Sequence, residues 1–337
     1  MPGTTKAVTM NAISHIQEAK APTLTLVVCQ VRLEAVGINS YELRDPRGCE
    51  LPPFTAGSHI DVYLHGGLVR QYSLCNPPSE RHHYVIAVLK DEAGRGGSRR
   101  LHETLHIPDL VKVSVPRNNF ELAPDGKRHI LIAGGIGITP LKAMAHELDE
   151  AGIDFELHYC AKSPEYTAFR EEIACLNKGG RVSYHFDGVD PSERLDVTKL
   201  LSRYTPGTHV YFCGPSGFMA ACAAAAAHWP SGTVHSEHFK AHGQPNRPVD
   251  DGKACVEIKS SGQRIEIAPD QSVADALNDA GIAIPTSCLS GLCGTCKIPY
   301  LSGEVDHQDV ILSDEERAHY FTACVSRPKS GVVVLDI

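Results

Sequence analysis

The stretch from Cys288 to Cys296 reads CLSGLCGTC, and a further cysteine, Cys324, follows much later in the chain. The order C-x4-C-x2-C with a distant fourth cysteine is typical of a plant-type [2Fe-2S] site. Three thiolates on one tight loop and a fourth from another segment can surround two irons, and Gly291 and Gly294 free the loop backbone to approach the sulfurs. This pattern predicts a domain that carries single electrons, with four metal ligands: Cys288, Cys293, Cys296 and Cys324.

A zinc knuckle is the alternative for the same cysteines. Structural zinc usually takes a second close pair of Cys or His ligands, and Cys324 has no such pair beside it in the sequence. The spacing therefore favours the iron–sulfur site over zinc.

The composition is that of a globular chain with room for two or three domains. The chain has 337 residues, of which 42% are hydrophobic and 21% charged. The formal net charge of -8 argues against nucleic acid as a partner, since phosphate binding needs clustered Lys and Arg. No apolar run approaches the roughly 20 residues that span a bilayer, and the N-terminus lacks the apolar region of a signal peptide. We expect a cytoplasmic protein without a membrane partner, whose other cysteines stay reduced.

The first part of the chain, residues 23–125, consists of short β-rich runs separated by turn residues. Strands without long helices between them indicate an antiparallel barrel or sandwich. The expected strands are Leu24–Val31, His59–Leu64, Val69–Leu74, Tyr84–Leu89 and Leu110–Val115. Residues 1–22 are expected to form a flexible tail before this domain.

The pattern changes at Arg128, where apolar strands begin to alternate with helical stretches. This alternation is typical of a parallel sheet with right-handed crossovers, and it predicts an α/β domain over residues 126–240. The expected strands are His129–Ala133, Phe155–Cys160, Val182–Phe186, His209–Cys213 and Thr233–Phe239, with helices at Leu141–Ala151, Tyr166–Leu176 and Ser216–His228. Residues 241–252, rich in Gly, Pro, Asn and Asp, indicate a linker. Short strands and a helix at Val273–Ala280 make residues 253–337 an α+β domain around the cysteine loop.

The sequence Arg70-Gln71-Tyr72-Ser73-Leu74 ends one of the expected barrel strands, and the turn Gly96-Gly97-Ser98 follows the next one. A flavin needs an aromatic or apolar wall, a hydrogen-bond partner near N5, and a cation with free backbone N–H groups for its phosphate. Arg70, Tyr72, Ser73 and the turn could meet these needs. The turn opens an expected short helix, Arg99–His106, whose N-terminus would favour an anion. The alternative is a strand with one polar face.

A glycine-rich turn, Gly134 to Pro140, lies between an apolar strand and a helix. There, glycines let the backbone approach a pyrophosphate whose charge the helix N-terminus attracts, although such turns also occur without a phosphate. Cys213-Gly214-Pro215 repeats this placement at a later strand end, so both turns should lie at the carboxyl edge of one sheet, where ligands of open α/β sheets bind. Cys213 could face a nicotinamide there or simply be a buried thiol.

His102-Glu103-Thr104-Leu105-His106 matches H-E-x-x-H, the metalloprotease helix in which two His hold zinc and the Glu activates water. The context argues against this function. Pro108 ends the segment almost at once, and no third ligand follows in a protease arrangement. A zinc hydrolase built on His102 and His106 is kept as a remote alternative.

The order of these parts resembles one known family, the class IA oxygenase reductases, which includes the phthalate dioxygenase and vanillate demethylase reductases. The likeness covers the chain from about Thr23 to Ile337. It is carried by the segments Arg70 to Asn76, Tyr84 to Val88, Gly94 to Ser98, Gly134 to Pro140, Cys213 to Pro215 and Gly232 to His235, together with the four cluster cysteines.

The resemblance implies an FMN-binding antiparallel β-barrel, an NAD-binding α/β domain with a parallel sheet and a plant-type ferredoxin domain of the β-grasp type. It implies that Ser73 lies near flavin N5, that Thr139 and Cys213 lie near the nicotinamide, and that Phe239 lies against the isoalloxazine. The implied cofactor-binding residues are Arg70, Gln71, Tyr72, Ser73, Ala87, Val88, Gly97, Ser98, Gly135, Ile136, Gly137, Thr139, Pro140, Cys213, Gly214, Pro215 and Phe239. NADH is favoured over NADPH only by analogy, since Cys160-Ala161-Lys162-Ser163 offers no clear acidic partner for a ribose hydroxyl.

The hypothesis is therefore a reductase that takes hydride from NADH onto FMN and passes single electrons through the [2Fe-2S] cluster. Flavin is the necessary intermediary, because nicotinamide reacts by hydride and an iron–sulfur centre by one electron at a time. By resemblance the acceptor is a Rieske-type oxygenase that acts on a small aromatic compound. A reductase of a cytochrome P450 is the alternative within the same class of enzyme.

Overall fold

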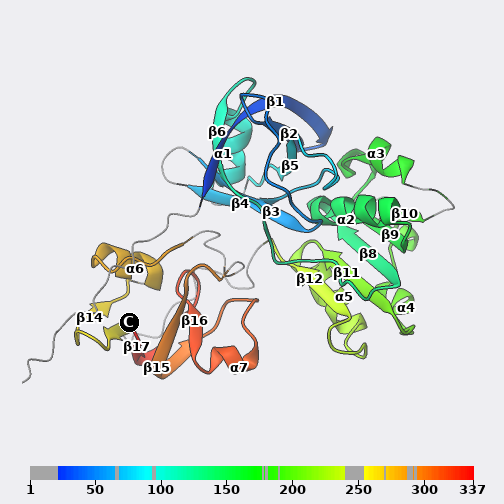
Figure 1. Ribbon diagram of the computed structural model, residues 1–337. Helices are drawn as coiled ribbons and strands as arrows, with labels where there is room; N and C mark the ends of the chain where they lie inside the picture. Colours follow the sequence, from blue (N-terminus) through cyan, green and yellow to red (C-terminus); the bar gives the residue numbers. More distant parts are fainter. Residues whose placement is uncertain are drawn as a thin grey trace, which may run out of the picture.

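The computed structural model describes residues 22–64, 68–92, 96–176, 178, 181–188, 190–239, 254–268, 271–286, 291 and 294–337. These residues form three lobes, each built around one β-sheet (Figure 1). The expected tail, apart from Pro22, and the expected linker lie outside the described residues. The described part of the chain contains no helix long and apolar enough to cross a membrane.

The first lobe is an antiparallel barrel. Its strands are β1 (Thr23–Ala35), β2 (Ile38–Arg44), β3 (Ser58–Tyr63), β4 (Val69–Ser73), β5 (Tyr84–Leu89), β6 (Leu110–Ser114) and β7 (Arg117–Asn118). They run in the order β4-β3-β6-β1-β2-β5, and a bridge between Leu74 and Ile86 joins the two ends of that order. Inward-facing residues such as Val28, Tyr41 and Ile60 are fully buried, so alternating side chains fill the barrel.

One helix covers an end of the barrel. It is α1 (Gly97–Thr104), and its Leu101 is packed into the barrel core. Two sequence expectations need correction here. The helix begins and ends two residues earlier than the expected Arg99–His106. The strand β2 was not predicted from the sequence.

The second lobe is a five-stranded parallel sheet. Its strands are β8 (Arg128–Gly134), β9 (Asp154–Ala161), β10 (Val182–Phe186), β11 (Thr208–Cys213) and β12 (Val234–Glu237), in the order β10-β9-β8-β11-β12. Its helical segments are η1 (Gly135–Gly137), α2 (Ile138–Ala151), η2 (Pro164–Tyr166), α3 (Arg170–Cys175), η3 (Pro191–Glu193), α4 (Val197–Leu200) and α5 (Ser216–Ala225). Because the strands are parallel, the turns after β8 and β11 meet at the same edge, as the sequence predicted.

The prediction of a single helix over Tyr166–Leu176 is wrong. The chain instead forms the short η2, then α3, with Phe169 between them at a positive φ of 60°. A residue with a large side chain adopts this left-handed conformation only where packing holds it. The Phe169 side chain is held in this way, because it is buried in the core beneath. Propensity alone does not reveal such a break.

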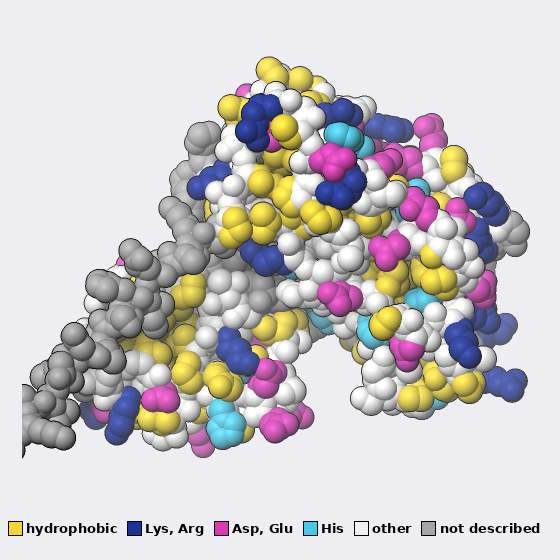
Figure 2. Space-filling model, in the orientation of Figure 1, with side chains coloured by type: hydrophobic (Ala, Val, Ile, Leu, Met, Phe, Trp, Pro, Cys, Tyr) yellow, Lys and Arg dark blue, Asp and Glu magenta, His cyan; other side chains and the backbone are white. Residues whose placement is uncertain are grey.

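The third lobe is a mixed sheet of β13 (Cys255–Ile258), β14 (Arg264–Glu266), β15 (Lys297–Asp306), β16 (Tyr320–Thr322) and β17 (Arg327–Leu335). Helix α6 (Val273–Asp279) packs Val273 and Leu277 into its core, and α7 (Asp314–Arg317) precedes β16. This is the small α+β arrangement expected around the cysteine loop. Figure 2 shows an open hollow between this lobe and the parallel-sheet lobe, beneath the barrel.

Candidate functional site

Three side chains from two lobes meet where the parallel sheet faces the barrel. Ser73 ends β4, and its hydroxyl donates to Glu237 Oε2 over 3.2 Å. Glu237 ends β12 and pairs in register with Cys213, the last residue of β11. The structure therefore brings together Ser73 and Cys213, which the family resemblance placed near flavin and nicotinamide, and adds the Glu237 carboxyl between them.

The titration of this group is set by burial. Desolvation raises the pKa of Glu237 to about 8, against the smaller lowering effect of the Ser73 hydroxyl. Burial also raises the pKa of Cys213 well above its usual value, and the nearby Glu237 carboxylate adds to that effect. At neutral pH the site therefore holds a protonated carboxyl and a neutral thiol rather than a nucleophilic thiolate.

The two glycine turns lie against each other. A Cβ added at Gly137 would be 2.1 Å from the carbonyl oxygen of Cys213, and one added at Gly214 would be 3.0 Å from Gly134 Cα. Only glycine permits this approach, so the turn after β8 sits directly on the end of β11. Bare backbone at the edge of a parallel sheet, next to the start of α2, is the environment that a pyrophosphate requires.

The remaining predicted residues of the first turn occupy different positions. Gly135 has a positive φ of 55° and open space around it, and Ile136 is partly buried. Thr139 and Pro140 are buried in the first turn of α2, where the Thr139 hydroxyl donates to the Ile136 carbonyl over 3.1 Å. Pro215 occupies the N-cap position of α5 without a side-chain capping hydrogen bond.

The expected flavin segment lies on the barrel side of the same junction. A Cβ added at Gly97 would be 2.3 Å from Arg70 Nε, so the start of α1 is in direct contact with this side chain. The Ser98 hydroxyl accepts from the Asp91 amide over 3.1 Å. A guanidinium packed on the first turn of an eight-residue helix is a suitable anchor for a phosphate.

The other residues named from the resemblance are buried or partly buried. Val88 and Ala87 are buried, and the carbonyl of Val88 lies 2.8 Å from His102 Nε2. Gln71 and Tyr72 are partly buried on β4. Phe239 is partly buried and packs against the buried cluster that the barrel and the parallel-sheet lobe share.

The residues present fit a flavin next to a nicotinamide dinucleotide. Two glycine cradles that a Cβ would fill, at Gly97 and Gly137, lie on either side of the junction, together with Arg70 as a cation. The Ser73 and Glu237 contact lies between them.

Two of the four predicted cluster ligands fall within the described residues. Cys296 directly precedes β15, and Lys297 pairs with Thr322 of β16, so the strand register brings Cys296 close to Cys324. Both cysteines are buried, at 3% and 9% exposure. Cys288 and Cys293 lie outside the described residues.

The loop around these cysteines also fits the cluster. Gly291 and Gly294 have positive φ of 67° and 72°, and a Cβ at Gly291 would be 2.7 Å from Val325. This is the glycine-dependent loop that the spacing predicts for an iron–sulfur site. The buried apolar residues beside Cys296 and Cys324 would limit the access of water to a cluster.

The remote zinc alternative is not supported by the geometry. His102 Nε2 faces the Val88 carbonyl, and its ring lies edge-on to Tyr41 at 6.3 Å. His106 lies beyond the end of α1, exposed, with Nδ1 3.8 Å from Asp109. The two imidazoles therefore do not sit one turn apart on a helix, which the zinc motif requires.

Glu237 is the site residue that sequence reasoning missed. The only signal in the sequence was its position near the end of the expected strand Thr233–Phe239, two residues before Phe239. A partly buried carboxyl at a strand end is common, so the signal becomes specific only when Ser73 is seen beside it.

Comparisons with known proteins agree with this arrangement. Residues 131–224 match the oxidoreductase NAD-binding domain, and residues 256–329 match the 2Fe-2S iron-sulfur cluster binding domain. The chain is 49% identical to the tert-butanol monooxygenase / tert-amyl alcohol desaturase reductase subunit of Aquincola tertiaricarbonis, over 97% of this chain and 100% of that one. It is 44% identical to a vanillate O-demethylase oxidoreductase of a Pseudomonas species, over 93% and 100% of the two chains.

Phthalate dioxygenase reductase appears both among the sequence relatives and among the solved structures. The chain is 42% identical to the phthalate dioxygenase reductase of Burkholderia cepacia, over 93% of this chain and 97% of that one. A solved phthalate dioxygenase reductase, described as a modular structure for electron transfer from pyridine nucleotides to [2Fe-2S], superposes with a TM-score of 0.76 at 42% identity. That match covers 94% of this chain and 98% of the solved one, and it confirms the predicted fold class.

A second solved structure places a similar unit in a longer chain. It is an intact type IV self-sufficient cytochrome P450 monooxygenase, with a TM-score of 0.78 and 40% identity. The match covers 94% of this chain but 41% of that one.

Proposed function

This chain belongs to the family of oxygenase reductases that includes phthalate dioxygenase reductase, and from that premise we propose that its acceptor is a Rieske-type oxygenase on another chain. Family membership makes the chain an NADH-dependent oxidoreductase, in which electrons move from NADH through FMN and a [2Fe-2S] cluster to an oxygenase. When bound, FMN supplies the conversion between a hydride donor and a one-electron outlet.

The single structural observation that supports electron transfer from NADH to FMN is the junction of the two N-terminal lobes. Ser73 of the barrel contacts Glu237 of the parallel sheet, beside Cys213 and the Gly137 turn. Such a junction holds a flavin and a nicotinamide against each other, which a binding module without turnover would not need.

We assign roles to this chain's residues accordingly. Arg70, with the start of α1 at Gly97 and Ser98, holds the flavin phosphate, and Gln71, Tyr72, Ala87 and Val88 line the ring side. Ser73 lies near N5 with its hydroxyl on Glu237, and Glu237 holds a proton on its carboxyl at neutral pH. Gly135, Ile136, Gly137, Thr139 and Pro140 with Cys213, Gly214 and Pro215 receive the dinucleotide, and Phe239 covers the flavin.

The cluster residues have a separate task. We propose that Cys288, Cys293, Cys296 and Cys324 bind the [2Fe-2S] cluster in the third lobe, at the point where electrons leave the protein. Burial of Cys296 and Cys324 supports this assignment. The exposed thiols of Cys29, Cys49 and Cys175 fit the reducing environment of the cytoplasm, where we place the protein.

We also propose the domain limits 23–125, 126–240 and 253–337. The first break falls in the loop between β7 and β8, and the second lies outside the described residues.

A P450 is the second candidate acceptor, and one observation favours it. The similar unit in the self-sufficient P450 shares 40% identity with this chain. The relatives that match over their full length are instead named as separate reductases or reductase subunits of oxygenases and demethylases, which favours an acceptor on another chain.

Stopped-flow mixing can distinguish the two acceptors. The protein is reduced with NADH without oxygen, and is then mixed with a purified Rieske-type phthalate or vanillate oxygenase or with a bacterial P450. We expect the Rieske centre to be reduced at least tenfold faster than the haem. Faster reduction of the haem would overturn the proposal.

A further inference from the structure

Lys142 has an unusual environment for a lysine. It lies on α2 and is 2% exposed, which makes it the one buried Lys or Arg in the described part of the chain. Removing an ammonium group from water is costly unless it is paired and hydrogen-bonded. A buried lysine at this position therefore needs an explanation beyond packing.

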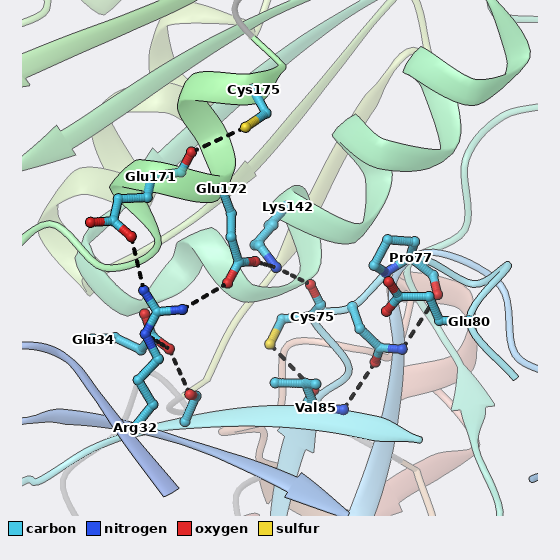
Figure 3. A network of polar contacts seen from close by, with 12 residues as sticks. Arg32, Glu34, Cys75, Pro77, Glu80, Val85, Lys142, Glu171, Glu172 and Cys175 are labelled. Carbon is cyan, nitrogen blue, oxygen red and sulfur yellow. Dashed lines mark hydrogen bonds and ion pairs between the residues drawn. The ribbon is translucent and has the colours of Figure 1, made fainter. Parts of the chain in front are cut away.

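The ammonium group of Lys142 has partners in both N-terminal lobes (Figure 3). It donates to the carbonyl oxygen of Cys75 over 2.9 Å and lies 2.5 Å from Glu172 Oε2. It also lies 4.6 Å from the centre of the Phe169 ring. Cys75 belongs to the barrel lobe, whereas Glu172 and Phe169 belong to the α3 region of the parallel-sheet lobe.

The contact continues back to the barrel. Arg32 of β1 lies 3.6 Å from Glu172 and 3.2 Å from Glu171, and its other acidic neighbour is Glu34 at 3.7 Å. Figure 3 shows these groups as one connected set that begins and ends on barrel strands. The set crosses the lobe boundary twice, which restrains both the separation and the twist of the two lobes.

The two ends of this connected set of ion pairs and hydrogen bonds, which we call the link, adjoin the proposed reaction site. Cys75 is two residues after Ser73, and its amide donates to Val85 on the neighbouring strand. Lys142 is three residues after Thr139, on the helix that begins at the Gly137 turn. The link therefore connects the strand end expected at the flavin to the turn expected at the nicotinamide.

Apolar contacts alone would leave this junction loosely defined. Cys75, Ala87, Ile138 and Leu141 share one buried cluster, but hydrophobic contact has no direction. Beside it lies a cavity of about 380 Å³ lined in part by Arg32, Asn76, Lys142 and Phe169, so dense packing does not fix the lobes there. Charge-assisted hydrogen bonds do have direction.

We propose that Lys142, held by Glu172, which Arg32 holds in turn, is a positioning residue for hydride transfer. It fixes the strand end at Ser73, assigned to the flavin, against the turn at Gly137, assigned to the nicotinamide. This rests on the proposed assignment of those two sites. Misplacement of reacting groups by about 1 Å costs on the order of 100-fold in rate. Loss of Lys142 should therefore slow the chemical step without weakening the binding of NADH.

The first test is anaerobic stopped-flow bleaching of the flavin over a range of NADH concentrations. Lys142→Met should lower the limiting rate about 10- to 100-fold and leave the apparent Kd for NADH within about twofold. Lys178→Met is the matched control, because this exposed lysine pairs at 3.1 Å with Asp149 of α2, the helix that carries Lys142, and this pair lies within the parallel-sheet lobe. The control should bleach at the normal rate.

The second test needs no flavin or NADH turnover. Amide hydrogen exchange at residues 74–76 should be about tenfold faster in flavin-free Lys142→Met than in the unmodified flavin-free protein, and unchanged in Lys178→Met. Glu172→Gln keeps the shape of a partly exposed side chain and provides a milder variant if Lys142→Met does not fold. It should lower the limiting rate several-fold, and the double variant should be no slower than Lys142→Met, because the two residues act as one unit.

Equal limiting rates and equal exchange in Lys142→Met and the unmodified protein would overturn the proposal. So would an additive effect of the two substitutions, or a loss confined to the Kd. Failure of NADH to bleach the unmodified protein would instead contradict the proposed function, and the exchange result would still stand for the link itself.

Discussion

Ser73 Oγ and Glu237 Oε2 lie 3.2 Å apart and join the end of β4 in the barrel to the end of β12 in the parallel sheet. This hydrogen bond connects two segments 164 residues apart. It places a carboxyl with a raised pKa beside the neutral thiol of Cys213. The proposed reaction site is therefore a property of the junction between lobes, and neither lobe contains it alone.

Glu237 should make stability depend on pH. Its pKa is about 8 in the folded protein and near 4.5 in an unfolded chain, so the folded state binds the extra proton between those values. Stability from this group is complete below about 4.5 and falls as the pH rises toward 8. Glu237→Gln should remove this decline, measured as the urea midpoint at several pH values from the fluorescence of Trp229, the sole tryptophan.

Glu237→Gln and the unmodified protein share all other titrating groups, so the difference between their pH profiles of stability isolates the contribution of Glu237.

Ser73→Ala is the companion variant. The Ser73 hydroxyl lowers the pKa of Glu237, so its removal should extend the decline to higher pH. Identical pH profiles for Glu237→Gln and the unmodified protein would rule out a raised pKa at this site.

Gly137→Ala should disrupt the glycine turn after β8, which is proposed to receive the nicotinamide dinucleotide. The added methyl would be 2.1 Å from the Cys213 carbonyl oxygen, and backbone cannot yield as a side chain can. We expect destabilisation of about 1–3 kcal/mol and at least tenfold weaker NADH binding, measured by urea unfolding and by NADH titration.

Gly217→Ala is the matched control for that substitution. Gly217 lies in the first turn of α5 with nothing within 4 Å of its added Cβ. Alanine there should leave NADH binding unchanged and stability equal or slightly higher. Equal NADH binding in the two variants would contradict the close contact of the turns.

Gly97→Ala should weaken flavin binding. Its methyl would meet Arg70 at Nε, Cγ and Cζ, between 2.3 and 2.9 Å, so the guanidinium must leave its position at the start of α1. We expect at least tenfold lower flavin affinity, measured by fluorescence during titration of the flavin-free protein. Arg70→Gln should cause a similar loss, and the double variant should add little, since both changes remove one contact. Unchanged affinity in Gly97→Ala would remove Arg70 from the phosphate site.

Local patterns in the sequence predicted much of the fold. Val182–Phe186 and Tyr84–Leu89 form the strands expected from their apolar runs, and the two glycine turns meet at one sheet edge. The errors occur where packing against residues distant in the sequence determines the local backbone conformation. Phe169 takes a positive φ because the core beneath it holds the ring, and a sequence window does not contain that core.

The sequence predicted the site only in part, because some of its residues act through partners that are distant in the chain. Ser73 and Cys213 were named from motifs, whereas Glu237 and Lys142 were not. Their roles depend on partners 164 and 67 residues away, Ser73 and the Cys75 carbonyl. Such contacts between lobes leave no periodic signal in the chain.

The central claim, that electrons enter at the lobe junction and leave at the cysteine cluster, is tested most directly by Cys296→Ser. The variant is compared with the unmodified protein for NADH-driven reduction of ferricyanide, which needs only the flavin, and of a one-electron protein acceptor, which needs the cluster. We predict normal ferricyanide reduction and at least a 100-fold loss with the protein acceptor, on the order expected when a required carrier is removed. Equal loss of both activities, or retention of both, would contradict the proposed order of carriers.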